Sequence, residues 1–256
     1  MIDPRAIVAP DADIAEGVEI GAFSVIGGGV RIGAGTWVGP HAVINGPTTL
    51  GRDNKVFQFA SVGDAPQDKK YRGEPTRLEV GDRNVFREFC SINRGTVGGR
   101  GVTRIGNDCL FMAYSHVAHD CTVGDHCVMS NCTALAGHVD IGDWVILSGY
   151  AGIHQFCKVG AHAFLANNAA VTRDVPPYLL VAGSPAEPKG VNSEGLKRRG
   201  FDAAQIANIK AAYRVFYRSG LKLAEAQERL TELAATQPEI RPFVEFLGSS
   251  ERSIIR

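Results

Sequence analysis

The chain has 256 residues, 45% of them hydrophobic, and its 27 lysines and arginines balance 27 aspartates and glutamates. It has no apolar run of 18 residues, and Met1–Arg5 lacks a basic-then-apolar leader, so we expect neither a membrane span nor a signal peptide. Zero net charge gives no reason to expect a nucleic-acid partner. The six cysteines include no Cys-x-x-Cys pair, which predicts free thiols in a reducing cytoplasm and no structural zinc.

From the first residues onward, an apolar residue recurs at every sixth position. A period of six fits no helix, and over this length it indicates a solenoid with one continuous core. Glycine often follows the apolar position, and we attribute it to sharp corners that need unusual φ. The series is Ile2, Val8, Ile14, Ile20, Ile26, Ile32, Val38, Ile44, Leu50, Val56, Val62, Val80, Phe86, Ile92, Ile105, Phe111, Val117, Val123, Met129, Leu135, Ile141, Leu147, Ile153, Val159, Leu165 and Val171.

Three six-residue units would close a triangular coil of 18 residues. The pattern resembles the left-handed parallel β-helix of hexapeptide-repeat proteins, and the handedness is implied by that resemblance. Successive coils should stack at the strand spacing of about 4.8 Å, so residues 18 apart should lie directly above one another.

The period breaks at two places, which predicts two loops that leave the coil, about 64–79 and 95–103. The first is polar and carries Lys69, Lys70 and Arg72, and the second is the glycine-rich run 95–101. Loops on a rigid scaffold are common places for binding groups, and the basic cluster favours such a role for the first loop over the alternative, a tolerated insertion.

After Val171 the repeat ends in a proline-rich, extended connector, 174–188. The sequence therefore predicts a mainly β domain, 1–188, and an α-helical domain, 189–256, with helices at about 202–218, 222–235 and 239–247. The second domain holds 12 Lys and Arg against 8 Asp and Glu, which indicates an acidic partner. Lys210, Arg214 and Arg218 form one stripe along the first helix; a solvated helix face is the alternative interpretation.

Histidines gather in one part of the repeat. On the 18-residue spacing, His119 lies below Gly137 and Gln155, Asp120 lies below His138, and position 136 lies below His154. We therefore expect His119, His138, His154 and Gln155 at one corner of three successive coils, with His116 and Asp120 on the same edge. Imidazole suits proton transfer near neutral pH, so this cluster is the candidate catalytic site.

Four stretches resemble the UDP-N-acetylglucosamine acyltransferase family, namely 66–76, 112–120, 153–156 and 192–201. This resemblance implies a homotrimer with active sites between adjacent β-helices. It also implies transfer of an (R)-3-hydroxyacyl chain from acyl carrier protein to the glucosamine 3-hydroxyl of UDP-N-acetylglucosamine, with no metal or bound cofactor.

Carried over by position, the resemblance makes His119 the general base, Asp120 its orienting carboxylate and the Gly137 amide the oxyanion donor. The substrate-binding residues that it implies are Gln67, Lys70, His116, His138, His154, Gln155, Asn192, Glu194 and Arg198. Long-chain members carry a glycine pair where this chain has Ala166-Asn167. Asn167 is therefore the predicted ruler for acyl-chain length, favouring chains of about 10–12 carbons. Asn167 could instead turn away and bond the neighbouring coil.

Three other functions fit parts of the pattern. A related N-acyltransferase shares the coils but has an extra N-terminal domain, for which a repeat that begins at Ile2 leaves no room. A γ-class carbonic anhydrase would need a three-histidine zinc site, but would leave the basic helical domain unexplained. A non-catalytic structural β-helix would leave the histidine cluster unexplained.

Overall fold

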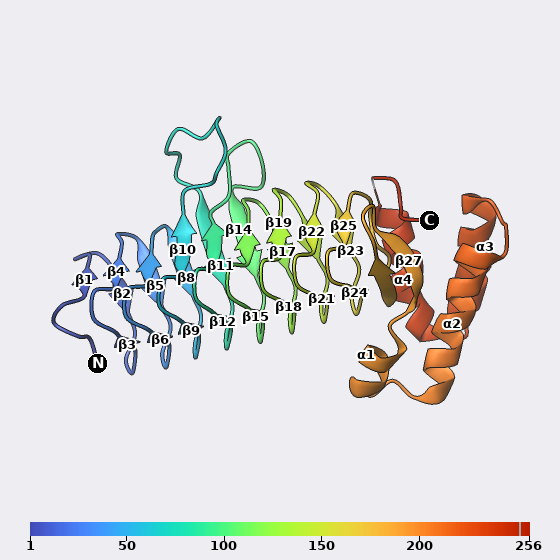
Figure 1. Ribbon diagram of the computed structural model, residues 1–256, viewed down its shortest axis with the longest axis horizontal. Helices are drawn as coiled ribbons and strands as arrows, with labels where there is room; N and C mark the ends of the chain where they lie inside the picture. Colours follow the sequence, from blue (N-terminus) through green and yellow to red (C-terminus); the bar gives the residue numbers. More distant parts are fainter. Residues whose placement is uncertain (251) are drawn as a thin grey trace.

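The chain winds as a long triangular coil whose three faces are parallel sheets, and helices cover its C-terminal end (Figure 1). The computed structural model describes residues 1–250 and 252–256. The predicted fold class, a left-handed parallel β-helix of hexapeptide repeats followed by a small helical domain, is confirmed. No helix in the described part of the chain has the length and apolar character needed to cross a membrane.

Each coil passes through three faces in turn, which we call faces I, II and III. Face I consists of β1 (Ile7–Val8), β4 (Val25–Ile26), β7 (Val43–Ile44), β10 (Ser61–Asp64), β13 (Ser91–Asn93), β16 (His116–Val117), β19 (Ala134–Leu135), β22 (Gly152–Ile153) and β25 (Ala170–Val171). Face II consists of β2 (Asp13–Ile14), β5 (Val30–Ile32), β8 (Thr48–Leu50), β11 (Arg77–Val80), β14 (Val102–Ile105), β17 (Thr122–Val123), β20 (Asp140–Ile141) and β23 (Lys158–Val159). Face III consists of β3 (Glu19–Ile20), β6 (Trp37–Val38), β9 (Lys55–Val56), β12 (Val85–Phe86), β15 (Leu110–Phe111), β18 (Val128–Met129), β21 (Ile146–Leu147), β24 (Phe164–Leu165), β26 (Leu179–Ala182) and β27 (Glu187–Val191).

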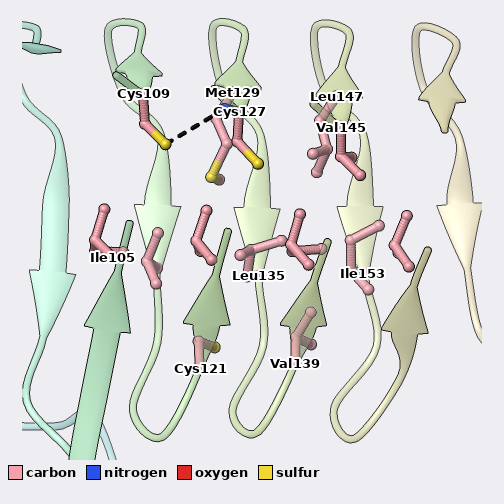
Figure 2. Close-up of a cluster of buried hydrophobic side chains, with 14 of the residues drawn as sticks. Ile105, Cys109, Cys121, Cys127, Met129, Leu135, Val139, Val145, Leu147 and Ile153 are labelled. Carbon is pink, nitrogen blue, oxygen red and sulfur yellow. Dashed lines mark hydrogen bonds between the residues drawn. The ribbon is translucent and has the colours of Figure 1, made fainter. Parts of the chain in front are cut away.

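The 18-residue spacing holds in the register of the strands. His116 pairs with Ala134, Ala134 with Gly152, and Gly152 with Ala170. In most strands the last residue points inward, and these side chains form one core along the axis, part of which Figure 2 shows. Leu135 and Leu147 are fully buried there. The six-residue period therefore predicted the core correctly.

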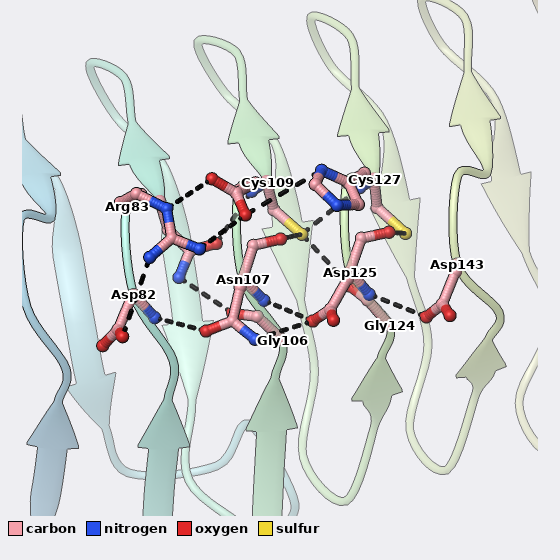
Figure 3. Close-up of polar contacts among 12 residues, drawn as sticks. Asp82, Arg83, Gly106, Asn107, Cys109, Gly124, Asp125, Cys127 and Asp143 are labelled. Carbon is pink, nitrogen blue, oxygen red and sulfur yellow. Dashed lines mark hydrogen bonds and ion pairs between the residues drawn. The ribbon is translucent and has the colours of Figure 1, made fainter. Parts of the chain in front are cut away.

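Coil edges are held by side chains that bond to the next coil. On the edge between faces II and III, the backbone N–H of Asp82 donates to Asn107, that of Asn107 to Asp125, and that of Asp125 to Asp143, at 2.7–2.8 Å (Figure 3). The prediction that the glycines after the apolar position supply unusual φ is wrong for most of them, because their φ is not positive. They supply space: a Cβ on Gly106 would lie 2.7 Å from the carbonyl carbon of Gly124.

Both excursions leave the coil at the edge between faces I and II and project on the same side (Figure 1). The first covers 65–76, because β11 already begins at Arg77, and it is shorter than the predicted 64–79. The second covers 94–101 rather than 95–103. β-structure also continues beyond Val171, since β26 pairs with β24 and β27 runs antiparallel to β26. The predicted boundary at residue 188 falls inside β27.

The C-terminal segment folds as α1 (Ser193–Arg198), α2 (Ala203–Arg218), α3 (Leu223–Ala234), a 3₁₀ turn (Pro238–Ile240) and α4 (Arg241–Ser249). The predicted helix after Asp202 is confirmed, with a capping box formed by Asp202 and Gln205. Its apolar side is buried as expected. The short α1 had no separate prediction, although its position decides where three candidate site residues lie.

Candidate active site

A histidine and an aspartate form a hydrogen-bonded pair on the I/II edge. His119 Nδ1 lies 2.9 Å from Asp120 Oδ2, and the aspartate side chain is fully buried. Because a carboxylate can only accept, Nδ1 carries the proton and Nε2 is left as the acceptor. The ring of His138, one coil further on, meets the His119 ring edge-to-face at 5.0 Å. Adjacency in sequence alone did not establish the His119–Asp120 contact, and the structure supplies it.

Burial and hydrogen bonding set the charge state of this pair. Burial of Asp120 acts to raise its pKa, but hydrogen bonds from His119 and Thr96 outweigh it and lower the pKa to about 2. Burial lowers the pKa of His138, although nearby Asp120 opposes that shift. Asp120 is therefore a fixed negative charge at neutral pH, and the imidazole of His138 near it stays uncharged more readily than usual.

Gly137 lies against the imidazole of His119, as the 18-residue spacing predicts. A Cβ at this position would lie 2.6 Å from His119 Cε1 and 2.8 Å from Nε2, so only glycine fits. Among the described residues, the Gly137 amide N–H donates no hydrogen bond. This N–H is thus available close to the basic nitrogen.

His116 and His154 lie beside this edge, on face I, rather than at the corner itself. Both line a shallow groove of about 440 Å³ that runs over the small outward residues Ala134, Gly152 and Ala170. Ser91 Oγ lies 2.7 Å from His116 Nδ1, and burial lowers the pKa of this histidine. The predicted cluster is therefore split: His119 and His138 touch, whereas His116 and His154 border the adjacent groove.

Gln155 shares the corner position of His119 and Gly137 and is exposed. The first excursion brings Gln67 and Lys70 to the same edge of the coil, and both are exposed. Tyr71, next to Lys70, accepts a hydrogen bond at 3.2 Å from Arg94, which lies at the base of the second excursion. Seven of the sequence-predicted residues thus occupy this edge: Gln67, Lys70, His119, Asp120, Gly137, His138 and Gln155.

A second group of predicted residues lies on another edge, where α1 covers the border of faces II and III. Asn192 caps α1 and donates to the His162 carbonyl oxygen at 2.9 Å. With Glu194 and Arg198, it lines a cavity of about 590 Å³ whose floor is apolar. Within one chain, this group therefore lies apart from His119.

Sequence reasoning missed two residues of this cavity. Arg199 lies over the ring of Trp144, 5.4 Å from its centroid, and Trp144 stacks on His126 at 4.0 Å. Burial lowers the pKa of Arg199. The Arg198-Arg199 pair was visible in the sequence, but only the fold shows which arginine lies over the aromatic ring.

One group of the described residues has ligand atoms close enough to suggest a metal: His119, Asp120 and His138, all within 4.8 Å. The donor set does not match the three-histidine zinc site of the carbonic anhydrase alternative. The oxygens of Asp120 already accept from His119, Thr96 and the Arg100 amide. A metal ion would have to break these bonds, so the group fits proton transfer better than zinc binding.

The repeat and the edge-mounted histidine–aspartate pair define a transferase of the hexapeptide class, and the family model "Bacterial transferase hexapeptide (six repeats)" matches residues 103–137. The model "Udp N-acetylglucosamine O-acyltransferase; Domain 2" matches residues 174–255. An acyl-[acyl-carrier-protein]–UDP-N-acetylglucosamine O-acyltransferase of Thiobacillus denitrificans is 56% identical, over 100% of this chain and 99% of its own length. The solved acyltransferases of Francisella novicida (44% identity, 100% of this chain and 94% of that one) and Moraxella catarrhalis (42%, 100% and 99%) both superpose with a TM-score of 0.98. The chain belongs to the UDP-N-acetylglucosamine O-acyltransferase family.

His162, beneath α1, gives the protein a predicted dependence of stability on pH. Burial, together with Arg199 3.3 Å away, lowers its pKa to about 4. Below its ordinary pKa near 6.5 the unfolded chain binds the proton first, so stability falls as pH drops from about 6.5 to 4. Relative to His162→Phe, wild type should lose roughly 1–3 kcal/mol between pH 7.5 and 4.5. Urea unfolding at both pH values measures this difference, and an equal pH response in both proteins would contradict it.

Proposed function

We propose that this chain transfers an (R)-3-hydroxyacyl group from acyl carrier protein to the 3-hydroxyl of UDP-N-acetylglucosamine, the first step of lipid A biosynthesis. The observation that carries the proposal is the His119–Asp120 pair, fixed on an edge with the free amide of Gly137 beside its basic nitrogen. The names of the relatives support the two substrates. Free thiols at all six cysteines support a reducing cytoplasm as the compartment.

In the proposed reaction His119 Nε2 removes the proton of the sugar 3-hydroxyl as its oxygen attacks the thioester carbonyl carbon. Asp120 holds the ring and stabilises the imidazolium that forms. The Gly137 N–H donates to the oxyanion of the tetrahedral intermediate. The intermediate collapses by breaking the C–S bond, and His119 returns its proton to the thiolate of the carrier. No metal or cofactor takes part.

The distribution of outward side chains supports a homotrimer. Face II carries charges, among them Arg31, Arg104 and Asp140, whereas faces I and III are mostly apolar or small. Where faces I and III meet, aromatic rings stack along the edge with centroids 4.9–5.5 Å apart, about half exposed: Phe23, His41, Phe59, Phe89 and Tyr114. Exposed aromatic surface of this extent is typical of a protein interface. With this edge on a three-fold axis, face I of each chain covers face III of the next.

This arrangement would unite the two groups of site residues. It brings the I/II edge of one chain, with His119, to the II/III edge of its neighbour, with α1. Lys70, His116, His138, His154 and Gln155 would then bind the sugar nucleotide together with Asn192, Glu194 and Arg198 of the next chain, and Gln67 would join them from the loop. Arginine suits a diphosphate because it keeps its charge and offers several donors.

The small-residue groove on face I is the proposed path of the acyl chain. It starts at His116 and rises over three coils, about 14 Å at the strand spacing, to Ala170. Asn167 lies in the turn just before Ala170, at the level where the groove ends. Its side chain is exposed, which supports a role as the ruler rather than a side chain tied to the next coil.

Asn167→Gly is expected to shift the acyl preference from about 10–12 carbons towards longer chains, because each extra methylene that can be buried is worth about 0.8 kcal/mol. Competition among hydroxyacyl carrier proteins of different length, analysed by product mass, measures the preference. Asn131→Gly is the matched control, since it changes the same position two coils below. An unchanged profile for Asn167→Gly would exclude this residue as the ruler.

Lys210, Arg214 and Arg218 are all exposed on α2 and form the proposed docking stripe for the acidic carrier protein. Reversing the three charges to glutamate should raise KM for the acylated carrier about 10-fold at low salt and leave kcat nearly unchanged, because exposed charges chiefly affect encounter. The control reverses Lys222, Arg229 and Arg241, which are exposed in the same domain and change the net charge equally. If both triple variants raise KM alike, the stripe has no specific role.

The function itself is tested with UDP-N-acetylglucosamine and a panel of (R)-3-hydroxyacyl carrier proteins. The expected product keeps the nucleotide and gains one hydroxyacyl group by mass, with release of the free carrier thiol. No acylated product with any chain length would contradict the proposal.

A further inference from the structure

The glycine-rich excursion 94–101 folds down onto the buried carboxylate of the catalytic pair. The hydroxyl of Thr96 donates to Asp120 Oδ2 at 2.6 Å, and its backbone N–H donates to the same carboxylate at 3.0 Å. The backbone N–H of Arg100 donates to Oδ1 at 2.8 Å. Asp120 therefore takes its remaining hydrogen bonds from this loop, and the oxygen that faces His119 is the one that Thr96 holds.

Two contacts hold the excursion 94–101 against the His119–Asp120 pair. Gly99 lies so close that a Cβ there would overlap the Asp120 carboxylate and lie 2.6 Å from His138 Cε1. On the other side, the guanidinium of Arg100 spans face II and bonds to Asp140 at 2.5 and 2.8 Å and to Thr122 at 2.7 Å. The loop is thus anchored on the coil and fitted against the pair, unlike a tolerated insertion.

We propose that Thr96 is a positioning residue for acyl transfer: through Asp120, its hydroxyl and amide fix the orientation and basicity of His119. This inference rests on the proposed function, since it assumes that His119 is the base. Thr96 itself is buried and bonds to the carboxylate rather than to a reacting atom, so its effect reaches the substrate only through Asp120.

The charges around the pair fix the direction of the expected pH effect. Asp120 faces His119, His138 at 4.0 Å and Arg100, while His119 faces His138 and His116, and Asp140 lies beyond Arg100. Without the Thr96 hydroxyl, Asp120 Oδ2 becomes a stronger acceptor for the remaining His119 N–H and stabilises the imidazolium more. The acid limb of kcat/KM should then move to higher pH.

The test compares Thr96→Val, which removes the hydroxyl at equal size, with Thr96→Ser, which keeps it. Thr96→Val is expected to lower kcat about 10- to 100-fold, as for loss of a hydrogen bond to a charged group, with KM of both substrates within about 2-fold. The acid limb of its pH profile of kcat/KM should move up by about half a pH unit. Thr96→Ser should keep both kcat and the acid limb close to their wild-type values. Thr36→Val is the matched control, because it removes another buried, hydrogen-bonded hydroxyl in a remote coil.

A double-mutant cycle separates a positional from a structural effect. In an Asp120→Ala background Thr96→Val should cause little further loss, because its route to His119 is gone. Wild-type rates in Thr96→Val, a rise in KM alone, or full additivity with Asp120→Ala would each overturn the inference.

If Thr96→Val does not fold, Thr96→Cys replaces it in the test, with the same expected direction and a smaller effect. His119→Ala in the same assay distinguishes failure of the proposed function from failure of this inference. An active His119→Ala protein would contradict the proposed chemistry. An inactive His119→Ala protein together with a fully active Thr96→Val protein would contradict only the role of Thr96.

Discussion

His119→Ala should lower kcat by about 10²- to 10⁴-fold, the usual range for loss of a positioned general base. Nε2 of His119 is the free nitrogen of a ring whose other nitrogen is committed to the buried Asp120. No neighbour can substitute for it at the same place, because His138 meets it edge-on from the next coil. Binding should persist, so KM for UDP-N-acetylglucosamine should change much less than kcat.

Steady-state kinetics with both substrates measures this effect, beside circular dichroism and the mass of the assembly. Asp120→Asn should lose less than His119→Ala, because the base stays in place with a less stabilised imidazolium. A folded His119→Ala protein that turns over at the wild-type rate would remove His119 from the mechanism.

The coil was predictable because a long six-residue apolar repeat indicates a solenoid with one core, whereas its handedness was implied by the family resemblance. An apolar side chain at every sixth residue must point to a common axis, and the register His116–Ala134–Gly152 follows from the period alone. The six-residue period could not predict the path of segments that lie outside the repeat. The strands β26 and β27 have no six-residue pattern and pair with each other through antiparallel hydrogen bonds. Their prolines led us to predict an extended connector instead.

The same limit applies to the site. The 18-residue spacing placed Gly137 over His119 because both lie within regular coils. It could not place Thr96 on Asp120, because the loop interrupts the register. It also placed His154 at the corner with His119, and His116 on the same edge, whereas both histidines border the groove on face I. Trp144 was missed because an outward aromatic residue on an edge has no periodic signal.

The second large effect is a recovery of activity, which we expect when two inactive variants assemble into the same trimer. In a single chain His119 and Arg198 lie on different edges, so the proposed composite site forms only where two copies meet. A His119→Ala chain lacks the base, and a Glu194→Ala/Arg198→Ala chain lacks the contacts from α1. Each variant trimer should therefore be nearly inactive alone, whereas mixed trimers contain some sites in which both contributions are intact.

Co-expression of these two inactive variants with different tags, followed by purification through both tags, tests this composite site most directly. Each mixed cyclic trimer contains one intact site out of three, so the doubly purified protein should recover about a third of wild-type acyltransferase activity. Separately purified variants that are mixed without reassembly should stay inactive. Co-assembled trimers no more active than either parent would contradict a site built from His119 of one chain and α1 of the next.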